Sequence, residues 1–418
     1  MKYILSIALR NLKRHKLRTV ISILAIVIAI IIGIFYRSIL LGYSETTIEN
    51  FIQLESGHAR IVNKEYARRE RVLPLMYPVD GFQGEGIEQM RSQLVKNTQI
   101  VGTLPRIKFG ASYVKEDEII RMMGWGVDVK DEIKFTDFDK HLISGHLPST
   151  DKREITVGSS LLEKLDKKVG EKVTLIYNTS FSSIQGSTFN IIGSIQTGLS
   201  YFDANIFLTS LDQAQEILYM PNQSTELLLF TQNKDNINVV IDDVDNMMSA
   251  KNGNRDYQIS SWLEAGGIIR WLMAYQNVIY IVIAFIVFLA SIIIINTLLM
   301  VIKERTREIG TLGALGMTKR EIILLFTTEG AIMGTIGSFI GVVIGGTLTY
   351  ITSQVGIDFG EVMDAMGDTL ISPVVYPVFS FENLLVAFII GSVVSTLSCI
   401  IPARKAAEIE PSEAMKDI

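Results

Sequence analysis

Four long runs of apolar side chains divide this sequence, and each is long enough to cross a lipid bilayer as a helix. Residues 19–36 include no Asp, Glu, His, Lys or Arg, and Ile, Val, Leu and Ala fill nearly every position. A helix rises about 1.5 Å per residue, so roughly 20 such residues span a hydrocarbon core of about 30 Å. The sequence therefore predicts transmembrane helices at residues 19–42, 274–302, 322–352 and 383–401.

The charges that flank these runs predict an orientation. Residues 1–18 and 303–321 are rich in Lys and Arg, whereas residues 353–382 carry only acidic charges. Because short cytoplasmic flanks hold the Lys and Arg excess, we expect 1–18, 303–321 and 402–418 to be cytoplasmic. The first run is longer than a signal-peptide core and no A-x-A-like site follows it, so a retained anchor is expected.

Composition excludes two classes of protein. The 418 residues carry a net charge of −5, which argues against a protein that mainly binds nucleic-acid phosphates. The single cysteine, Cys399, excludes an intramolecular disulfide framework.

The stretch 43–273 is expected to form a large extracytoplasmic mixed α/β domain between the first two helices, with an inserted lobe near 130–222. A helix is expected from Ile237 to Met248, and the first transmembrane helix is expected to continue to Phe51. Ser261 and Glu264 have capping-box spacing, which predicts that the second transmembrane helix begins there. Apolar alternation and short β-rich runs predict strands at 118–123, 154–157, 173–177, 189–195, 205–208 and 226–230.

The inner loop 303–321 has more than the charges that set topology. It also carries apolar residues that a purely topogenic loop does not need, which favours an amphipathic segment that presents a face to a cytoplasmic partner. Gly310, Gly313 and Gly316 do not have the G-x-x-x-x-G-K-[ST] spacing of a phosphate loop, and no such loop occurs in the sequence. Any ATP-driven action must therefore use an ATPase on another chain.

Several short motifs at both ends of the chain resemble the permease core of the ABC superfamily that includes FtsX, MacB and lipoprotein-releasing (Lol-type) permeases. They are Arg-Glu-Ile-Gly at 307–310, Ala-Leu-Gly at 314–316, Glu-Gly at 329–330, Pro-Ala-Arg-Lys-Ala-Ala at 402–407, Pro411, and Glu-Ala at 413–414. Other segments are more similar to Lol-type permeases: 56–61 with Asn63 and Tyr66, 104–107, 124–128 and 261–264. The run 145–158 resembles the wider superfamily and does not discriminate. A separate ATPase also favours the Lol type over MacB.

This resemblance implies a multi-pass permease of the bacterial inner membrane, not itself an enzyme, that extracts lipoproteins and passes them to a periplasmic carrier. The chain would work with a second permease subunit, identical or related, and a cytoplasmic ABC ATPase dimer that binds ATP and Mg. Residues 303–321 would be the coupling helix on that ATPase. The ATPase-coupling candidates are Arg307, Glu308, Ile309, Gly310, Leu312, Leu315 and Met317.

The resemblance also implies a substrate cavity between the outer halves of the first two helices of two permease subunits. The candidates are Ile34, Phe35, Ile39, Tyr43, Trp271, Met273, Tyr275 and Ile279. Simple anchoring at the membrane interface is the plainer role for the aromatic ones.

Two alternatives stay open: a MacB-like efflux permease driven by mechanical motion, and an FtsX-like signalling subunit that activates an envelope hydrolase. Gly337, Gly341 and Gly345 recur every four residues, which permits close helix packing within the subunit or between subunits. Glu329 is expected to pair with Lys303, Arg320 or water. No catalytic constellation or metal cluster is evident in the sequence, and His141 and His146 lack the spacing of a helical metal pair.

Overall fold

The computed structural model divides the chain into two compact units. The helical unit comprises Met1–Ser44, Met273–Asp358 and Val374–Ile418, and the α/β unit comprises Glu45–Leu272 and Phe359–Pro373. The structure describes residues 2–14, 16–115, 118–150, 152–232, 237–251, 256–264, 267–360 and 374–409.

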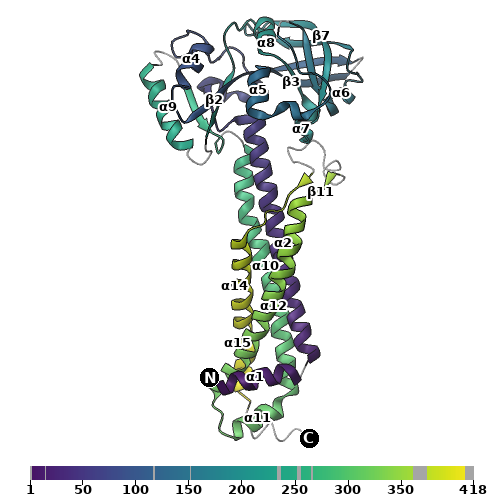
Figure 1. The fold of residues 1–418 in the computed structure, drawn as a ribbon, viewed down its shortest axis with the longest axis vertical. Coiled ribbons are helices and arrows are strands. Elements are labelled where there is room, and N and C mark those ends of the chain that lie inside the picture. The colour runs from purple at the N-terminus through teal and green to yellow at the C-terminus, as the bar shows by residue number, and fades with distance from the viewer. Residues whose placement is uncertain are drawn as a thin grey trace. The chain divides into compact units, whose positions relative to one another are not determined.

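Long helices build the helical unit (Figure 1). Two of them, α2 and α10, continue past its boundaries into residues assigned to the α/β unit. The elements are α1 (Lys2–Arg14), α2 (Lys16–Phe51), α10 (Gly267–Glu304), α11 (Thr306–Ala314), α12 (Lys319–Val355), α14 (Phe381–Ser398), α15 (Ile400–Ala407) and the short strands β11 (Ile357–Asp358) and β12 (Val374–Val375).

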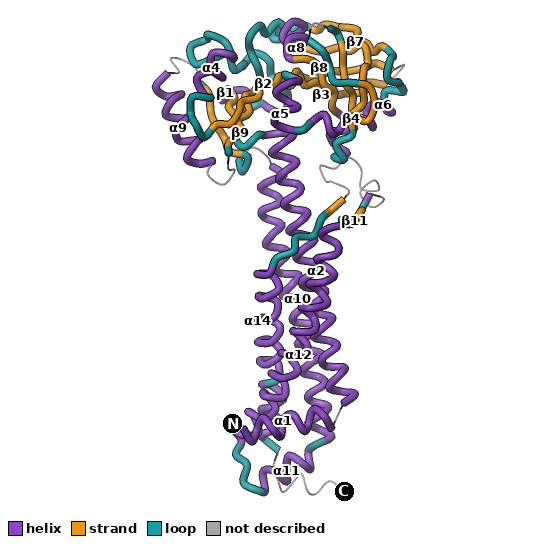
Figure 2. The backbone as a smooth tube through the Cα atoms, in the orientation of Figure 1, coloured by secondary structure: helices purple, strands orange, loops and turns teal. Residues whose placement is uncertain are grey.

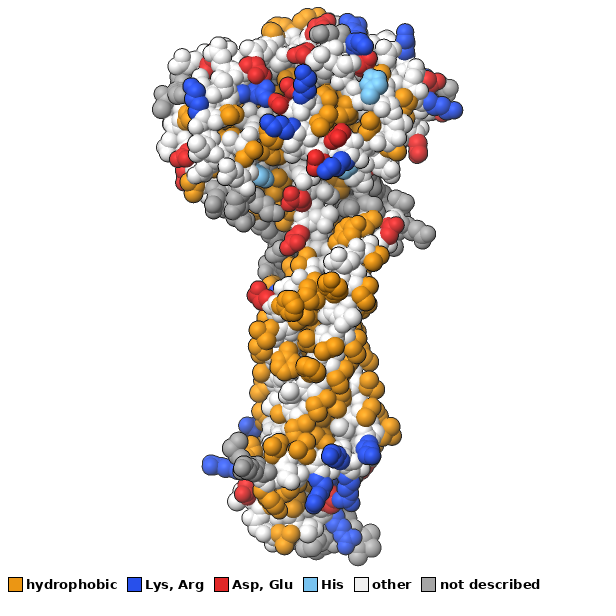
Figure 3. Space-filling view, viewed as in Figure 1, with side chains coloured by type: hydrophobic (Ala, Val, Ile, Leu, Met, Phe, Trp, Pro, Cys, Tyr) orange, Lys and Arg blue, Asp and Glu red, His pale blue; other side chains and the backbone are white. Residues whose placement is uncertain are grey.

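Four helices among the described residues are long and apolar enough to cross a membrane: Thr19–Ser56, Val278–Glu304, Lys319–Val355 and Phe381–Ala407. The predicted continuation of the first helix to Phe51 is confirmed. Many apolar side chains on these helices face outward, and they cover the visible face of the helical unit (Figure 3). Phe285 and Phe288 of α10, for example, are each 59% exposed. Such a surface requires an apolar environment.

Glycines bring α12 close to α2 and α14. A Cβ at Gly341 would lie 2.8 Å from Cβ of Ile30, and one at Gly337 would lie 2.9 Å from Cβ of Ile26. Gly345 faces the Cα of Ile31 in the same way. This glycine stripe therefore packs against α2 within the chain.

The ten strands described in the α/β unit form one sheet (Figure 2). Its order is β10-β1-β9-β2-β3-β8-β5-β7-β4, and β6 pairs with β2 and β7. The strands are β1 (Ala59–Asn63), β2 (Ile100–Lys115), β3 (Glu118–Val127), β4 (Leu142–Gly145), β5 (Glu154–Gly158), β6 (Lys172–Asn178), β7 (Ile184–Ile195), β8 (Ile206–Ser210), β9 (Glu226–Thr231) and β10 (Tyr257–Ser261).

Short helices and turns connect these strands. They are η1 (Ile52–Ser56, a π-helical turn), α3 (Lys64–Arg68), η2 (Glu70–Val72), α4 (Ile87–Leu94), α5 (Val129–Thr136), η3 (Phe138–His141), α6 (Ser159–Lys164), α7 (Ser200–Asn205), α8 (Leu211–Leu218) and α9 (Ile237–Lys251). Ser210 caps α8, since its Oγ accepts a hydrogen bond from the N–H of Gln213 at 3.2 Å.

Separate apolar cores lie at different parts of the sheet. One core packs α4 and α9 against β1 and β9, with Met90, Val240 and Leu229 fully buried or nearly so. Another packs α6 against β5 and β7 and packs α8 against β2, β3 and β8, with Leu161, Phe189 and Phe207 buried in it. All six predicted strands and the predicted helix from Ile237 are present.

The expected start of the second transmembrane helix is wrong. Ser261 is the last residue of β10, where it pairs with Ala59, and α10 begins at Gly267. The N–H of Glu264 bonds to the carbonyl of Ser261 in a turn, so the capping-box spacing here marks a turn after a strand.

Candidate functional site

A short helix, α11, connects α10 to α12 at one end of the helical unit. Gly316, with φ +97°, follows α11 and makes a turn that a side chain would strain. Thr318 then starts α12 with a capping box, because its N–H donates to Oε2 of Glu321 at 2.8 Å and its Oγ1 accepts from the N–H of Glu321. The loop predicted from 303–321 is thus a defined helix–turn–helix segment.

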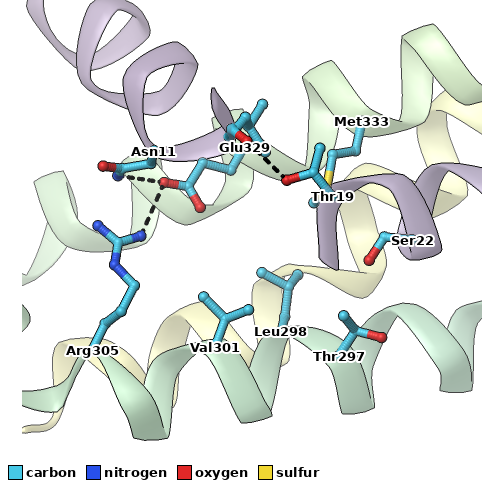
Figure 4. A pocket seen from close by; sticks show the side chains of 10 residues that line it. Asn11, Thr19, Ser22, Thr297, Leu298, Val301, Arg305, Glu329 and Met333 are labelled. Carbon is cyan, nitrogen blue, oxygen red and sulfur yellow. Dashed lines mark hydrogen bonds and ion pairs between the residues drawn. The ribbon is translucent and has the colours of Figure 1, made fainter. Parts of the chain in front are cut away.

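A polar cluster fixes this segment to two other helices (Figure 4). Glu329 of α12 accepts a hydrogen bond from Nδ2 of Asn11 at 2.7 Å, and a guanidinium nitrogen of Arg305 lies 3.7 Å from the same carboxylate oxygen. Arg305 also donates to Glu308 at 2.8 Å, and Glu308 pairs with Arg14 at 2.7 Å. Of the three expected partners of Glu329, Lys303 and Arg320 are therefore wrong, because Arg305 and Asn11 contact its carboxylate, and the contact with water stays a prediction. Asn11 was not expected, since residues 1–18 were predicted as a basic flank without a helix.

The chain of contacts Arg14–Glu308–Arg305–Glu329–Asn11 joins α1, α11 and α12. Glu329 is 3% exposed and Arg305 6%, so this pair is shielded from solvent screening. A cavity of about 30 Å³, which has room for a water molecule, lies beside it. A displacement of α11 would therefore change its contacts with both α1 and α12.

The coupling candidates fall into two groups. Ile309 and Gly310 are buried in the core of the helical unit, and Met317 packs against that core. Arg307 is exposed, Glu308 and Leu312 are half-buried, and Leu315 is 80% exposed. Only the second group is accessible to a partner.

An apolar groove of about 520 Å³ lies between α2 and α10. Its lining is Ile21, Leu24, Ala25, Ile28, Ala29, Ile32, Ile286, Leu289, Ala290 and Ile293. The sequence did not single these residues out, because α2 is apolar on every side and its periodicity marks no face.

The predicted cavity residues are outside the lining of this groove. Those of α2 come after it in sequence, toward Phe51, and those of α10 come before it, toward Gly267. Ile34 and Ile279 are buried, whereas Phe35, Ile39 and Tyr43 are half-buried. The side chains of Trp271, Met273 and Tyr275 lie outside the described residues, although α10 includes their backbone.

In the α/β unit, β2 sends Arg106 and Lys108 into the interior. Arg106 is fully buried, pairs with Glu132 of α5, donates to the carbonyl of Leu54 at 2.5 Å, and stacks 4.8 Å from the ring centre of Trp125. Such stacking over an aromatic face is favourable for a guanidinium. Asp128 accepts hydrogen bonds from the N–H groups of Lys130 and Asp131 and so starts α5, which carries Glu132.

Lys108 extends this network to the end of α2. Its Nζ lies 2.7 Å from a carboxylate oxygen of Glu55 and 2.9 Å from one of Glu226. Arg60 pairs with both oxygens of Glu70, at 2.5 and 2.8 Å. Because Leu54 and Glu55 belong to η1, directly after α2, the network ties that turn to β2.

The electrostatics of this network follow from burial and pairing. Burial alone lowers the pKa of Lys108, but Glu226 and Glu55 outweigh it and raise its pKa overall. Burial raises the pKa of Glu132 against the opposing effect of Arg106. Burial also raises the pKa of Glu70, but the hydrogen bonds and charge of Arg60 reverse this and lower it.

Arg60, Tyr66, Arg106 and Trp125 come from three of the segments that carry the Lol-type resemblance. These segments are far apart in sequence, and the sheet brings them to this one network. Among the residues that the structure describes, no group of three or more His, Cys, Asp or Glu side chains is placed to hold a metal ion.

Comparison with known proteins finds similarity to permeases over most of the chain. Residues 280–411 match the family described as FtsX-like permease C-terminal. An uncharacterized ABC transporter permease of Methanocaldococcus jannaschii is 20% identical over 99% of this chain and 97% of that protein. The lipoprotein-releasing system transmembrane protein LolC of Xylella fastidiosa is 22% identical over 75% of this chain and 79% of its own length.

The macrolide export ATP-binding/permease protein MacB of Escherichia coli is 25% identical over 43% of this chain, which corresponds to 26% of that protein. The periplasmic region of MacB from Actinobacillus actinomycetemcomitans is similar in structure, with a TM-score of 0.35 and 13% identity over 52% of this chain and 94% of that chain. The chain thus contains an FtsX-like permease domain at residues 280–411 and is similar to ABC transporter permeases of both the Lol type and the MacB type.

Proposed function

We propose that this chain is the permease subunit of an ATP-driven complex that extracts lipoproteins from the outer leaflet of a bacterial inner membrane and passes them to a carrier. ATP and Mg would be bound by a separate cytoplasmic ATPase dimer, and a second permease subunit, identical or related, would complete the complex. The observation that carries the proposal is α11. The exposed ion pair Arg14–Glu308 joins this helix to α1 and the buried pair Arg305–Glu329 joins it to α12, while Leu315 beside it is exposed.

Membrane insertion explains the surface of the helical unit. Four helices carry exposed apolar side chains that water would not tolerate as one large surface. In Figure 3, basic side chains gather at the end of the helical unit where Figure 1 labels α1 and α11, as a cytoplasmic flank requires. Both termini would then be cytoplasmic and residues 43–273 periplasmic.

A lipoprotein cargo fits the relatives and the apolar surfaces. LolC, whose name assigns it to a lipoprotein-releasing system, matches three quarters of this chain. The outer half of α2 offers Phe35 and Ile39 as partly exposed apolar contacts for acyl chains. Burial of each CH₂ contributes about 0.8 kcal/mol, so release of a long acyl chain requires an energy input that ATP would supply.

Site-specific photo-crosslinking tests the cargo. A crosslinker at Ile39 should capture lipoprotein in cells, whereas one at Phe339, which is 62% exposed on α12, should capture only lipid and serves as the control. Capture of no lipoprotein at Ile39, or equal capture at both positions, would count against the proposal.

MacB-like export is the second candidate, because MacB matches 43% of this chain. It predicts co-purification of a periplasmic adaptor and an exit duct without lipoprotein. An FtsX-like signalling role instead predicts a cell-wall defect with normal lipoprotein sorting when the protein is depleted.

A further inference from the structure

A third space in the helical unit, apart from the cavity beside Glu329 and the apolar groove, has a polar end, which we call its mouth. It measures about 60 Å³ and lies between α2, α10 and α14. Ile and Val side chains line most of it, among them Ile30, Ile286 and Ile390. Arg37 of α2 is the charged residue and Asn383 of α14 the amide residue in its lining.

Among the described residues, both polar residues have donor groups without a partner. Asn383 is 8% exposed, and its Nδ2 has no hydrogen-bond partner among the described residues. No carboxylate of the described residues pairs with Arg37. A buried unpaired amide costs free energy, and a charged side chain in an apolar helix marks a site with a specific partner.

Arg37 and Asn383 both lie near the same end of the membrane-spanning part of their helices. Arg37 lies 18 residues after Thr19, which corresponds to about 27 Å of helix. It therefore reaches the boundary opposite the basic segment that precedes Thr19. Asn383 lies in the first turn of α14, whose N-cap residue, Ser380, makes no side-chain capping hydrogen bond. The first-turn N–H groups of α14 thus add further donors.

The cavity adjoins the apolar groove between α2 and α10. Ala29 and Ile286 line both spaces. The groove extends along α2 from Ile32 back to Ile21, about 16 Å of helix. A cationic mouth that leads into an apolar groove of this length fits an anion that carries an acyl chain.

We propose that Arg37 and Asn383 bind the phosphate group of a phospholipid of the outer leaflet, with one of its acyl chains in the groove between α2 and α10. A guanidinium binds phosphate oxygens through two parallel hydrogen bonds, and the Asn383 amide donates a third. The proposal rests on the membrane insertion proposed above. The cavity shares Ile34 with the predicted cargo cavity, so the site is tested with purified lipid in the absence of cargo.

Native mass spectrometry of the full chain in detergent tests the site. The probes are phosphatidylglycerol, a diacylglycerol with the same chains, oleate and inorganic phosphate. Phosphatidylglycerol should bind wild type with a Kd at least about tenfold lower than it binds Arg37→Gln or Asn383→Leu. Asn383→Asp should bind as weakly, because its carboxylate repels phosphate, while Arg37→Lys should retain part of the affinity.

Lys16→Gln is the matched control, since it removes one positive charge from the other end of α2 and should leave the Kd unchanged. Elution as a folded species in size-exclusion chromatography qualifies each variant for comparison. Equal affinity of wild type and Arg37→Gln would overturn the proposal, as would equal binding of the diacylglycerol. Displacement of the lipid by equimolar oleate or by millimolar inorganic phosphate would overturn it too, in favour of a carboxylate or a free-phosphate site. The cargo crosslinking at Ile39 fails or succeeds separately from these outcomes.

Discussion

Arg106 is a fully buried cation whose partners come from three different elements. Replacement by Met would leave Glu132 buried without its counter-charge and would remove the contact to the Leu54 carbonyl. Loss of one partner of a buried pair typically costs about 3–5 kcal/mol. We therefore expect Arg106→Met to destabilise the α/β unit by about that amount, measured by hydrogen–deuterium exchange of β1 and β2 amides in the full chain.

An exposed ion pair in the same unit provides the control. Lys140 lies 2.7 Å from Asp137, but both side chains are well exposed. Lys140→Gln should leave the exchange rates unchanged, because exposed pairs contribute little. If Arg106→Met and Lys140→Gln changed the exchange rates equally, burial would not explain the stabilisation by Arg106.

Glu70 predicts a pH dependence. Its pKa in the folded chain lies below the ordinary value of 4.5, so its pairing with Arg60 stabilises the fold above that pH and is lost as pH falls through the lower, folded pKa. Because Glu70 is about one third exposed, we expect Glu70→Gln to cost only about 1 kcal/mol at pH 7. The difference between wild type and Glu70→Gln, measured by exchange of β1 amides, should shrink as pH falls below 4.5. A difference that grows in that range would contradict this assignment.

Gly341 tests the packing of α12 on α2. A methyl group there would lie 2.8 Å from Cβ of Ile30, with backbone of Val27 close behind, so the helices would have to separate. Gly341→Ala should lower the free energy of unfolding by about 1–3 kcal/mol, the usual cost of overpacking, and this loss should appear as a lower melting temperature. Gly33→Ala is the control, since nothing lies within 4 Å of its added methyl group, and it should cause no loss of melting temperature.

The partners of buried charges were the residue-level features that the sequence could not supply. Arg106 and Glu132 are 26 positions apart, and Lys108 and Glu226 are further still. Each looks like an ordinary surface charge in sequence, because pairing is visible only once the sheet brings the strands together. The segments that include Arg60, Arg106 and Trp125 were nevertheless marked by resemblance alone.

At the scale of elements, the α11 segment exposes some of the ATPase-coupling candidates and buries others. Leu315→Asp should weaken association with the ATPase while the chain folds normally, because Leu315 is 80% exposed. Ile309→Asp should instead reduce folded protein, since Ile309 is 2% exposed and packs in the core. Co-purification of the ATPase and the yield of monodisperse permease measure the two effects. Normal ATPase binding by Leu315→Asp would exclude Leu315 from the interface.

Regular alternation made some strands predictable and its absence hid others. β6 alternates exposed and buried residues along its whole length and was predicted. β2 was not predicted: it is buried at every position from Gly102 to Phe109, so it does not alternate, and it includes Pro105, Arg106 and Lys108, which are unusual in a central strand. It lies between β9 and β3 in the sheet, where Arg106 and Lys108 pair with carboxylates from other segments of the chain.

At the scale of the whole molecule, length and hydropathy predicted the four apolar helices because each is long and nearly free of charge. The helix bounds were less predictable. The first apolar helix continues to Phe51, well past the predicted end of the membrane-spanning part at residue 42, and α10 begins at Gly267. The extension of α2 carries Glu45 and Glu49 and that of α10 carries Arg270, so the uncharged run marks where a bilayer would end and leaves the end of the helix unmarked.

The proposed orientation predicts opposite labelling of the two units in cells. In a Cys399→Ser background, which removes the one native thiol, cysteines would be placed at Leu315 and at Phe181, which are 80% and 77% exposed. A membrane-impermeant maleimide should label Phe181→Cys once the outer membrane is opened, because the acidic α/β unit faces the periplasm. It should label Leu315→Cys only after the inner membrane is also opened, because Lys and Arg hold the α11 end in the cytoplasm. The reverse pattern, or labelling of both cysteines at the first step, would contradict the orientation and with it the assignment of α11 to a cytoplasmic ATPase.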